Sequence, residues 1–517
     1  MMDEPTTETR LDSMKQRVLR WFLGRHYTPA SQPGVADVVH DSAAGVFFGG
    51  QYIHPDYLDA HYLICGSTGS GKTWTLRMLM KSVLFDAQGR LKARALVYDP
   101  KNELLPLLPK LGVPEDSIRI LDPFHEKSVR WNVAADINTP AAAGHFSTLL
   151  FPDEGDQNRF FVEAARGLLR GVLLSFIHRR IPDWTLFHVL KALDLRADML
   201  RNLLNAGPPE SQALAIRFVQ DNSKTTTDIL ATVTTITAPY RVVANLWQQA
   251  EEDISLEQWV NGETAPILVL STREHARTPI DAINRVVVKR ISEYFVDLPD
   301  VRRGDTETWF FLDELREAGK LDGLSTLLTR SRSKGGHVVL AFQDVNGLRL
   351  VYGDNGANEL ANHCGNIAGL RVNDPTTGDW LAGRMGKHEQ WMQGFSDGES
   401  TDADGNTSYS HNTSRNLQER FYMPGYEFME FGMTTPERGL FGAYRVPGAI
   451  GPWATNIPPE TVSLLGGSDA ADAPNDYPSR PTGGQWDAEL TDNDKHILGL
   501  NKSTESGRSA FRRPSLD

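Results

Sequence analysis

The chain has 517 residues, of which 40% are apolar and 23% are charged. These values are ordinary for a soluble globular protein with more than one domain, and they exclude disorder over most of its length. The net charge of −13 argues against a protein that merely coats nucleic acid, and two cysteines exclude a disulfide framework.

The first part of the chain falls into two segments. Residues 1–45 are expected to form a helical lead, with a short basic amphipathic helix between Leu11 and His26. From residue 46 to 182, β-rich runs alternate with helical stretches, and strands are predicted at 62–65, 93–98 and 118–121. This alternation favours an α/β fold with a parallel sheet covered on both faces.

The next segment, 183–254, has apolar residues at helical spacing and few strand signals, so we predict an all-α insertion there. Strand patterns resume in 255–435, which is expected to supply the second half of the same α/β domain. Within this half, Gly394 to Asn416 is rich in Ser, Thr, Asn and Gly and is interpreted as an exposed loop. Residues 436–517 are predicted to be a C-terminal extension, mostly a disordered tail.

A phosphate-binding loop is predicted between the strand at 62–65 and the helix that follows it. The motif G-x-x-x-x-G-K-[ST] is complete and lies in its confirming context of strand and helix. Lys72 is expected to reach the β- and γ-phosphates of ATP, and the hydroxyl of Thr73 is expected to bind Mg²⁺. The loop consists of Gly66, Ser67, Thr68, Gly69, Ser70, Gly71, Lys72 and Thr73.

Two carboxylates follow the apolar run 309–312. Asp313 is expected to hold Mg²⁺ through water, and Glu314 is expected to polarise the attacking water as general base. The alternative is that both acids cap the following helix. Because an adjacent Glu is typical of hydrolysing motors and unnecessary in a nucleotide kinase, the pair favours an ATP-hydrolysing motor.

Three further positions are weaker candidates. Gln343 ends a predicted strand and could sense the γ-phosphate or the attacking water, or be an ordinary polar residue. Arg332, in the basic cluster 330–334, is either a solvated residue or an arginine finger acting in a neighbouring subunit. The turn Asp99 to Glu103 could position nucleotide or polymer, or be a simple turn.

Taken together, these motifs resemble those of one known family, over roughly Val46 to Phe431. They are Gly66 to Thr73, Asp99-Pro-Lys101 with Glu103-Leu104, Leu121-Asp-Pro-Phe124 with Trp131-Asn132, Leu150-Phe-Pro-Asp153, Leu312-Asp-Glu-Leu315, Arg332 with Gly335-Gly336, and Phe342-Gln343. Their order and spacing are similar to those of the type IV secretion coupling proteins, the DNA-pumping ATPases of bacterial conjugation.

The resemblance implies a RecA-like domain with an inserted all-α domain, assembled as a hexameric ring around DNA. It also implies ATP and Mg²⁺ as cofactors, Lys72 and Thr73 as their ligands, Asp313 and Glu314 as metal and catalytic acids, Gln343 as sensor and Arg332 as finger. The implied partners are DNA, a relaxase and a secretion-channel or membrane protein.

One feature departs from this family. The usual pair of N-terminal membrane-spanning helices is missing, with only about sixty residues before the loop, and no window of about twenty apolar residues occurs anywhere. We therefore expect a cytoplasmic protein, with docking at the inner face of the membrane as the alternative.

Other functions stay open from the sequence. They are a DNA motor of the chromosome-segregation or DNA-end-processing type, a protein-secretion or pilus-assembly ATPase indifferent to DNA, and a docking protein that binds ATP without hydrolysis.

Overall fold

The computed structural model describes residues 45–500 except 58, 152–158, 222, 303–306, 402–406, 436, 449, 467–478, 481–485 and 487. The predicted helical lead, residues 1–45, lies almost wholly outside the described part. The chain divides into two compact units. The first, which we call the sheet unit, comprises Met1–Ser117 and Phe295–Pro474, and the second, the helical unit, comprises Ile118–Tyr294 and Asn475–Asp517.

Seven strands of the sheet unit follow one another in the order β15-β14-β11-β3-β10-β9-β4. The five from β11 to β4 are parallel, and β14 and β15 are antiparallel additions at one side. Every residue of β3 is buried, so its sequence is a nearly continuous apolar run and does not alternate between apolar and polar residues. The strands are β3 (His61–Cys65), β4 (Arg94–Asp99), β9 (Thr308–Leu312), β10 (Gly336–Phe342), β11 (Cys364–Gly369), β14 (Leu440–Val446) and β15 (Ile450–Ile457).

The sheet therefore continues past residue 435, where the sequence analysis ended the second α/β half. β14 pairs with β11, with Ala368 opposite Tyr444, and Tyr444 is buried. The run Leu440 to Ile457 was predicted to belong to the C-terminal extension. Its apolar residues instead complete the core at this side of the sheet.

Helices and short strands surround this sheet. A small hairpin of β1 (Val46–Phe48) and β2 (Gln51–Ile53) packs on α2, where the main-chain N–H of Phe47 donates to Ser82 Oγ at 2.7 Å. The helix α17 packs on α2 as well. The helices of this unit are α2 (Lys72–Leu84), α3 (Leu108–Leu111), α13 (Leu324–Arg330), α14 (Val345–Asn362), α15 (Pro375–Met385), α16 (Gly425–Glu430) and α17 (Pro459–Gly466), with 3-10 turns η2 (Pro55–Tyr57), η3 (Leu105–Leu107), η4 (Glu115–Ser117) and η7 (Arg332–Lys334).

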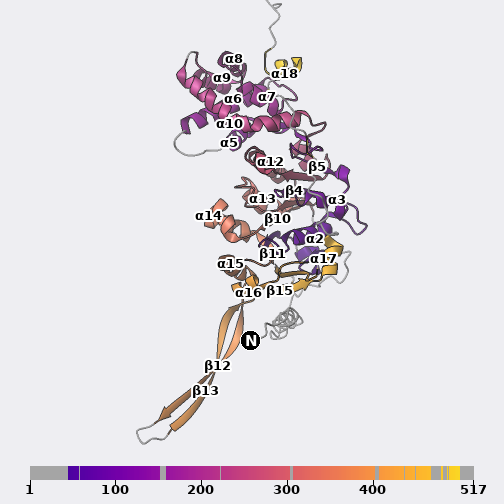
Figure 1. Cartoon of the computed structure of the whole chain (residues 1–517), viewed down its shortest axis with the longest axis vertical. Coiled ribbons are helices and arrows are strands. Elements are labelled where there is room, and N and C mark those ends of the chain that lie inside the picture. Colours follow the sequence, from indigo (N-terminus) through magenta and orange to yellow (C-terminus); the bar gives the residue numbers. More distant parts are fainter. Residues whose placement is uncertain are drawn as a thin grey trace, which may run out of the picture. The chain divides into compact units, whose positions relative to one another are not determined.

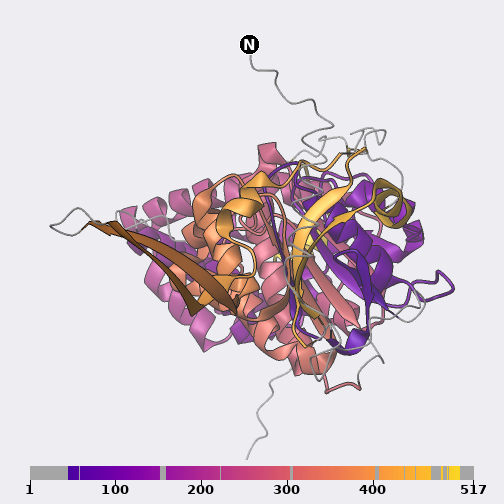
Figure 2. The ribbon, with the colours of Figure 1, turned by 90° about the horizontal axis from the view of Figure 1, so that it is seen from below.

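A long β-hairpin replaces the exposed loop predicted at Gly394 to Asn416. It consists of β12 (Lys387–Thr401) and β13 (Thr407–Phe421), paired over their full length. Figure 1 shows this ribbon extending beyond α15 and α16, and Figure 2 shows its twist. The loop prediction was wrong because the hairpin is exposed on both faces, so its composition is polar although its backbone is paired.

The helical unit contains four consecutive helices, α7 to α10, within 183–254, where an all-α insertion was predicted, but the unit begins at Ile118, inside the segment predicted to be the first α/β half. It also contains α6, a 20-residue helix whose buried face includes Leu168, Leu169 and Val172. The elements are α4 (Val133–Asp136), α5 (Pro140–Leu150), α6 (Arg159–His178), α7 (Leu186–Leu193), α8 (Ala197–Asn205), α9 (Pro209–Phe218), α10 (Lys224–Gln248), α11 (Leu256–Asn261), α12 (Arg277–Asp297), α18 (Asp492–Ile497), η6 (Glu274–Ala276), and the parallel pairs β5 (Ile118–Ile120) with β8 (Ile267–Ser271) and β6 (Arg130–Trp131) with β7 (Asp253–Ile254).

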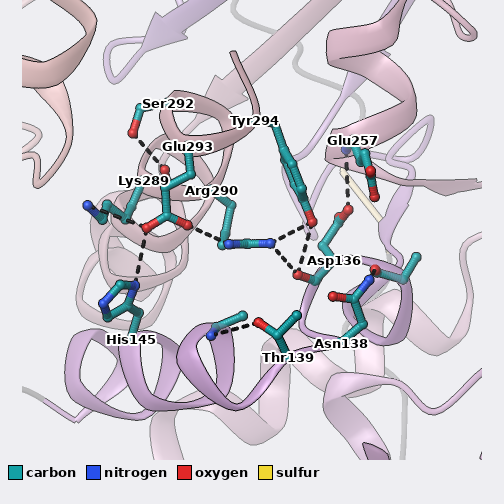
Figure 3. Close-up of polar contacts among 12 residues, drawn as sticks. Asp136, Asn138, Thr139, His145, Glu257, Lys289, Arg290, Ser292, Glu293 and Tyr294 are labelled. Carbon is teal, nitrogen blue, oxygen red and sulfur yellow. Dashed lines mark hydrogen bonds and ion pairs between the residues drawn. The ribbon is translucent and has the colours of Figure 1, made fainter. Parts of the chain in front are cut away.

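A buried polar network around Asp136 joins four elements of the helical unit (Figure 3). The carboxylate of Asp136 accepts hydrogen bonds from Trp131 Nε1 at 2.6 Å and Ser255 Oγ at 3.0 Å. Its main-chain carbonyl accepts from Arg290 Nη2 at 2.9 Å and Tyr294 Oη at 3.1 Å. Because these donors lie in β6, at the start of α11 and on α12, Asp136 connects these three elements to its own helix, α4.

The described residues after Asn475 contact the helical unit. Arg480 donates to the carbonyls of Leu246 and Glu126, and Asp494 of α18 accepts a hydrogen bond from His188 Nε2 at 2.9 Å. The prediction of a disordered tail was therefore wrong for these residues, whereas 467–478 and 501–517 lie outside the described part. In the described part of the chain, no helix has the length and apolar character needed to span a membrane.

Candidate active site

The loop Gly66 to Thr73 joins β3 to α2 and is fixed by both neighbouring strands. The N–H of Gly66 donates to the carbonyl of Phe342 at the end of β10, at 3.1 Å. The N–H of Ser67 donates to the carbonyl of Arg371, just beyond β11, at 2.7 Å. The loop is therefore held at the carboxyl edge of the sheet, where a parallel sheet places ligands.

The glycines of the loop are required by its backbone and by close approach. Gly69 and Gly71 have φ of +74° and +97°, which glycine adopts without steric cost. A Cβ on Gly66 would lie 2.5 Å from Ser70 Oγ. The hydroxyl of Ser70 is itself buried and has no hydrogen-bond partner among the described residues. This cradle of glycines with an unpaired hydroxyl fits a phosphate group.

A distant segment supports the same loop from outside the strands. Thr434, between α16 and β14, donates its N–H to the carbonyl of Gly69 at 3.1 Å and its hydroxyl to the carbonyl of Ser70 at 2.9 Å. The Met433 methyl group lies so close to Gly69 that a Cβ there would approach it to 2.7 Å. No local sequence signal indicated this contact, because the partners are more than 360 residues apart.

Asp313 and Glu314 directly follow β9. Asp313 is buried, and burial raises the pKa of its carboxyl to about 6, although the nearby Lys72 ammonium opposes the shift. Glu314 has φ of +47°, a left-handed conformation that costs about 1–2 kcal/mol for a residue with a Cβ. Its N–H is held by Asp313 Oδ1 at 2.9 Å. In this left-handed conformation, the Glu314 side chain contacts residues that follow the neighbouring strands β4 and β10.

Two donors meet on one oxygen of Glu314. Lys101 Nζ lies 2.9 Å from Glu314 Oε2, and Gln343 Nε2 donates to the same oxygen at 2.8 Å. The amide oxygen of Gln343 in turn accepts from the Thr68 hydroxyl at 3.4 Å. Gln343 therefore links the phosphate-binding loop to the carboxylate, which is the position required of the predicted sensor.

Lys101 and Glu103 come from the turn after β4, which the sequence analysis treated as either functional or a simple turn. Asp99, fully buried, organises this turn by accepting three main-chain N–H groups, from Glu103, Leu104 and Leu105, at 2.8–3.0 Å. As a result Lys101 contacts Glu314, and Glu103 Oε2 accepts from the Thr73 hydroxyl at 3.3 Å. The turn is part of the site.

Arg332 is not brought to this site. It precedes β10, whereas Gln343 follows it, so the two lie at opposite ends of a seven-residue strand about 20 Å long. Its side chain is exposed. Within one chain Arg332 therefore cannot serve the site to which Lys72 and Glu314 contribute.

Residues 47–421 match the family described as the type IV secretion-system coupling protein DNA-binding domain. The chain belongs to the type IV secretion-system coupling protein family. No curated protein sequence matches the chain significantly.

Solved coupling-protein structures share the fold. The unbound monoclinic form of the bacterial conjugative coupling protein TrwBdeltaN70 is 20% identical with a TM-score of 0.62, covering 81% of this chain and 89% of that one. The plasmid coupling protein TrwB in complex with ADP and Mg²⁺ is 19% identical with a TM-score of 0.61, covering 81% and 90%. TrwB with a non-hydrolysable ATP analogue gives the same values. The predicted RecA-like α/β fold of this coupling protein is therefore confirmed.

Proposed function

We propose that this coupling protein is an ATP-hydrolysing motor that translocates DNA, with a relaxase, towards a secretion channel during conjugative transfer. The observation that carries the proposal is that Lys72, Thr73, Asp313, Glu314 and Gln343 converge at one sheet edge in a chain of this family. The residues support hydrolysis as well as binding, because a general base stands beside a phosphate cradle.

The site suits Mg·ATP. Backbone N–H groups of the loop and Lys72 would bind the phosphates, while Thr73 and Asp313 would supply oxygen ligands for Mg²⁺. Among the described residues no cluster of three or more His, Cys, Asp or Glu side chains could hold a metal by itself. When bound, Mg²⁺ would neutralise part of the negative charge of the phosphates.

Glu314 would take the proton of the attacking water, and Gln343 would report the state of that site to the loop through Thr68. Asp313 must be ionised to bind the metal. Burial lowers the pKa of Lys72, with Glu314 and Asp313 opposing the shift, so its ammonium depends on nearby negative charge. The phosphates would supply such charge directly.

Arg332 supports assembly as a ring. An exposed arginine at the opposite sheet edge could reach phosphate only in a neighbouring subunit, where it would neutralise transition-state charge. We therefore propose a homo-oligomer, a hexameric ring around DNA, located in the cytoplasm or docked on a membrane partner at the inner face of the membrane.

The test is ATP hydrolysis by the purified chain with and without single- and double-stranded DNA, with Glu314→Gln as the control. Stimulation by DNA that disappears in the variant supports the proposal. Turnover indifferent to DNA would favour a protein-secretion ATPase instead. The absence of turnover in the wild type under all these conditions would contradict a motor and favour a nucleotide-dependent docking protein.

A further inference from the structure

Glu314 is a buried carboxylate with an ionic partner on a neighbouring strand. Its side chain is 3% exposed, and Lys101 Nζ is 2.9 Å from its Oε2 atom. The Lys101 side chain is 38% exposed, so its stem reaches solvent while its ammonium points into the site. Burial alone would lower the pKa of Lys101, but the hydrogen bond and charge of Glu314 raise it above its ordinary value.

From this geometry, and resting on the proposed hydrolysis, we propose that Lys101 is a positioning residue for Glu314. It acts on the catalytic carboxylate rather than on the nucleotide. Lys101 and Gln343 bind the same oxygen, Oε2, from the ends of β4 and β10, the strands on either side of β9. Two donors on one oxygen fix the side-chain torsions and therefore the direction in which the carboxylate can receive a proton.

The arrangement also accounts for the strained backbone at Glu314. A left-handed residue with a Cβ persists only when its surroundings hold it. Here Asp313 Oδ1 accepts the N–H of Glu314, while the side chain is held by the two donors. Without the ammonium, this buried carboxylate would lose the partner that offsets its desolvation, and its side chain would be free to rotate.

Lys101 is itself held in place. The turn that carries it is fixed by the three N–H groups that Asp99 accepts, and Asp99 is fully buried. The N–H of Asp313 donates to the carbonyl of Tyr98, so β4 and β9 remain in register up to the site. A rigid support is what a positioning residue requires, because a displacement of about 1 Å at a reacting group can cost about 100-fold in rate.

The experiment compares Lys101→Met and Lys101→Arg with the wild type, alone and in a Glu314→Gln background. Methionine keeps the length of the stem without charge, and arginine keeps the charge. Lys110→Met, an exposed lysine on α3, is the matched control for loss of one positive charge. The readouts are kcat and KM for ATP with DNA present, nucleotide affinity by calorimetry, and Tm.

We expect Lys101→Met to lower kcat about 10- to 100-fold, the usual effect of losing a supporting contact, while KM and nucleotide affinity change less than about threefold. Lys101→Arg should recover part of kcat, and Lys110→Met should match the wild type. In the Glu314→Gln background, Lys101→Met should cause no further loss. A rise in KM with kcat retained in Lys101→Met would overturn the proposal. So would a double variant in which Lys101→Met and Glu314→Gln each lower kcat by the same factor as they do alone.

The Tm series tests the ion pair without any turnover. Lys101→Met should lower Tm by about 2–4 °C in the wild-type background and by clearly less when Glu314 is already Gln. Equal Tm losses in both backgrounds would contradict the pair. If the wild type does not hydrolyse ATP, the proposed function is refuted. If the wild type hydrolyses ATP and Lys101→Met has the same kcat, only the role of Lys101 is refuted.

Discussion

The ammonium of Lys72 donates a hydrogen bond to the carbonyl oxygen of Gly66, the first residue of its own loop, at 2.8 Å. This bond closes the loop across six residues and keeps the phosphate cradle in shape. Because the side chain is buried, its ammonium group needs a hydrogen-bond partner, which is this carbonyl in the present structure and would be a phosphate when nucleotide is bound.

Lys72→Ala is therefore expected to abolish hydrolysis and to weaken nucleotide binding at least about 10-fold, since a charge-assisted contact to phosphate contributes about 1.5–3 kcal/mol. Calorimetric titration with ADP and Mg²⁺ measures the change. Lys92→Met, which removes an exposed lysine before β4, is the control. Unchanged affinity in Lys72→Ala would exclude the loop as the nucleotide site.

Mg²⁺ dependence should vary with pH in the range set by Asp313. Its pKa is raised to about 6, so the protonated form is favoured below that pH and must lose a proton to bind the ion. The Mg²⁺ concentration for half-maximal hydrolysis should therefore rise as pH falls below about 6 and be nearly constant above about 7. Asp313→Asn should remove this dependence together with most activity. A flat Mg²⁺ requirement from pH 5 to 8 would argue against Asp313 as a ligand.

Thr434→Val tests the support of the loop from the C-terminal side. The variant keeps the N–H bond to Gly69 and loses the hydroxyl bond to Ser70, which is worth about 1 kcal/mol. Nucleotide affinity should fall about fivefold with little change in Tm. Thr329→Val, at an exposed helical position, is the comparison. If Thr434→Val and Thr329→Val bind nucleotide equally well, the segment does not shape the loop.

Asp136→Ala is expected to destabilise the helical unit by about 3 kcal/mol or more, because several buried donors lose their acceptor at once. Chemical denaturation followed by tryptophan fluorescence measures this, since Trp131 is among the donors. Below the unfolding transition, nucleotide affinity should stay within about twofold of the wild type. Loss of nucleotide binding in the folded variant would show that the effect is not confined to this network.

The hairpin has two large apolar side chains that are mostly or half exposed in the described structure. Trp391 and Leu417 face each other across the strands and are 66% and 47% exposed. Replacing both by Ser should change stability by less than about 0.5 kcal/mol per site. Thermal unfolding measures this, and a clear drop in Tm would show that these residues pack against another part of the protein.

The parts of the site that could be predicted from sequence are those in which the functional residues directly follow a predicted strand. Gly66 to Thr73 follows a strand and opens a helix, and Asp313 and Glu314 end another strand, so their meeting at one sheet edge followed from parallel topology. The turn that contains Lys101 was a candidate from the sequence, but its contact with Glu314 could not be predicted. That contact depends on which strand lies beside β9 and on the left-handed backbone conformation of Glu314. Thr434 carried no signal at all.

The errors in fold have a similar cause. The sequence Gly394 to Asn416 was interpreted as a loop, because an exposed ribbon lacks the strong alternation that a buried face imposes. The strand Leu440–Val446 was placed in the C-terminal extension, whereas its partner, β11, is about seventy residues earlier and no local pattern links the two. The all-α insertion was predictable because helical spacing depends only on residues three and four positions apart.

The strand order of the sheet unit has a consequence for biosynthesis. β3, with the phosphate-binding loop at its end, lies between β10 and β11, which are made more than 270 residues later. At about 5–20 residues per second, a ribosome needs at least about 14 seconds to supply those partners. During that interval the apolar strand Tyr62 to Cys65 has neither neighbour, and the loop cannot hold nucleotide. We expect chaperones to bind the nascent chain there, and ATP to stabilise the protein only after translation is nearly complete.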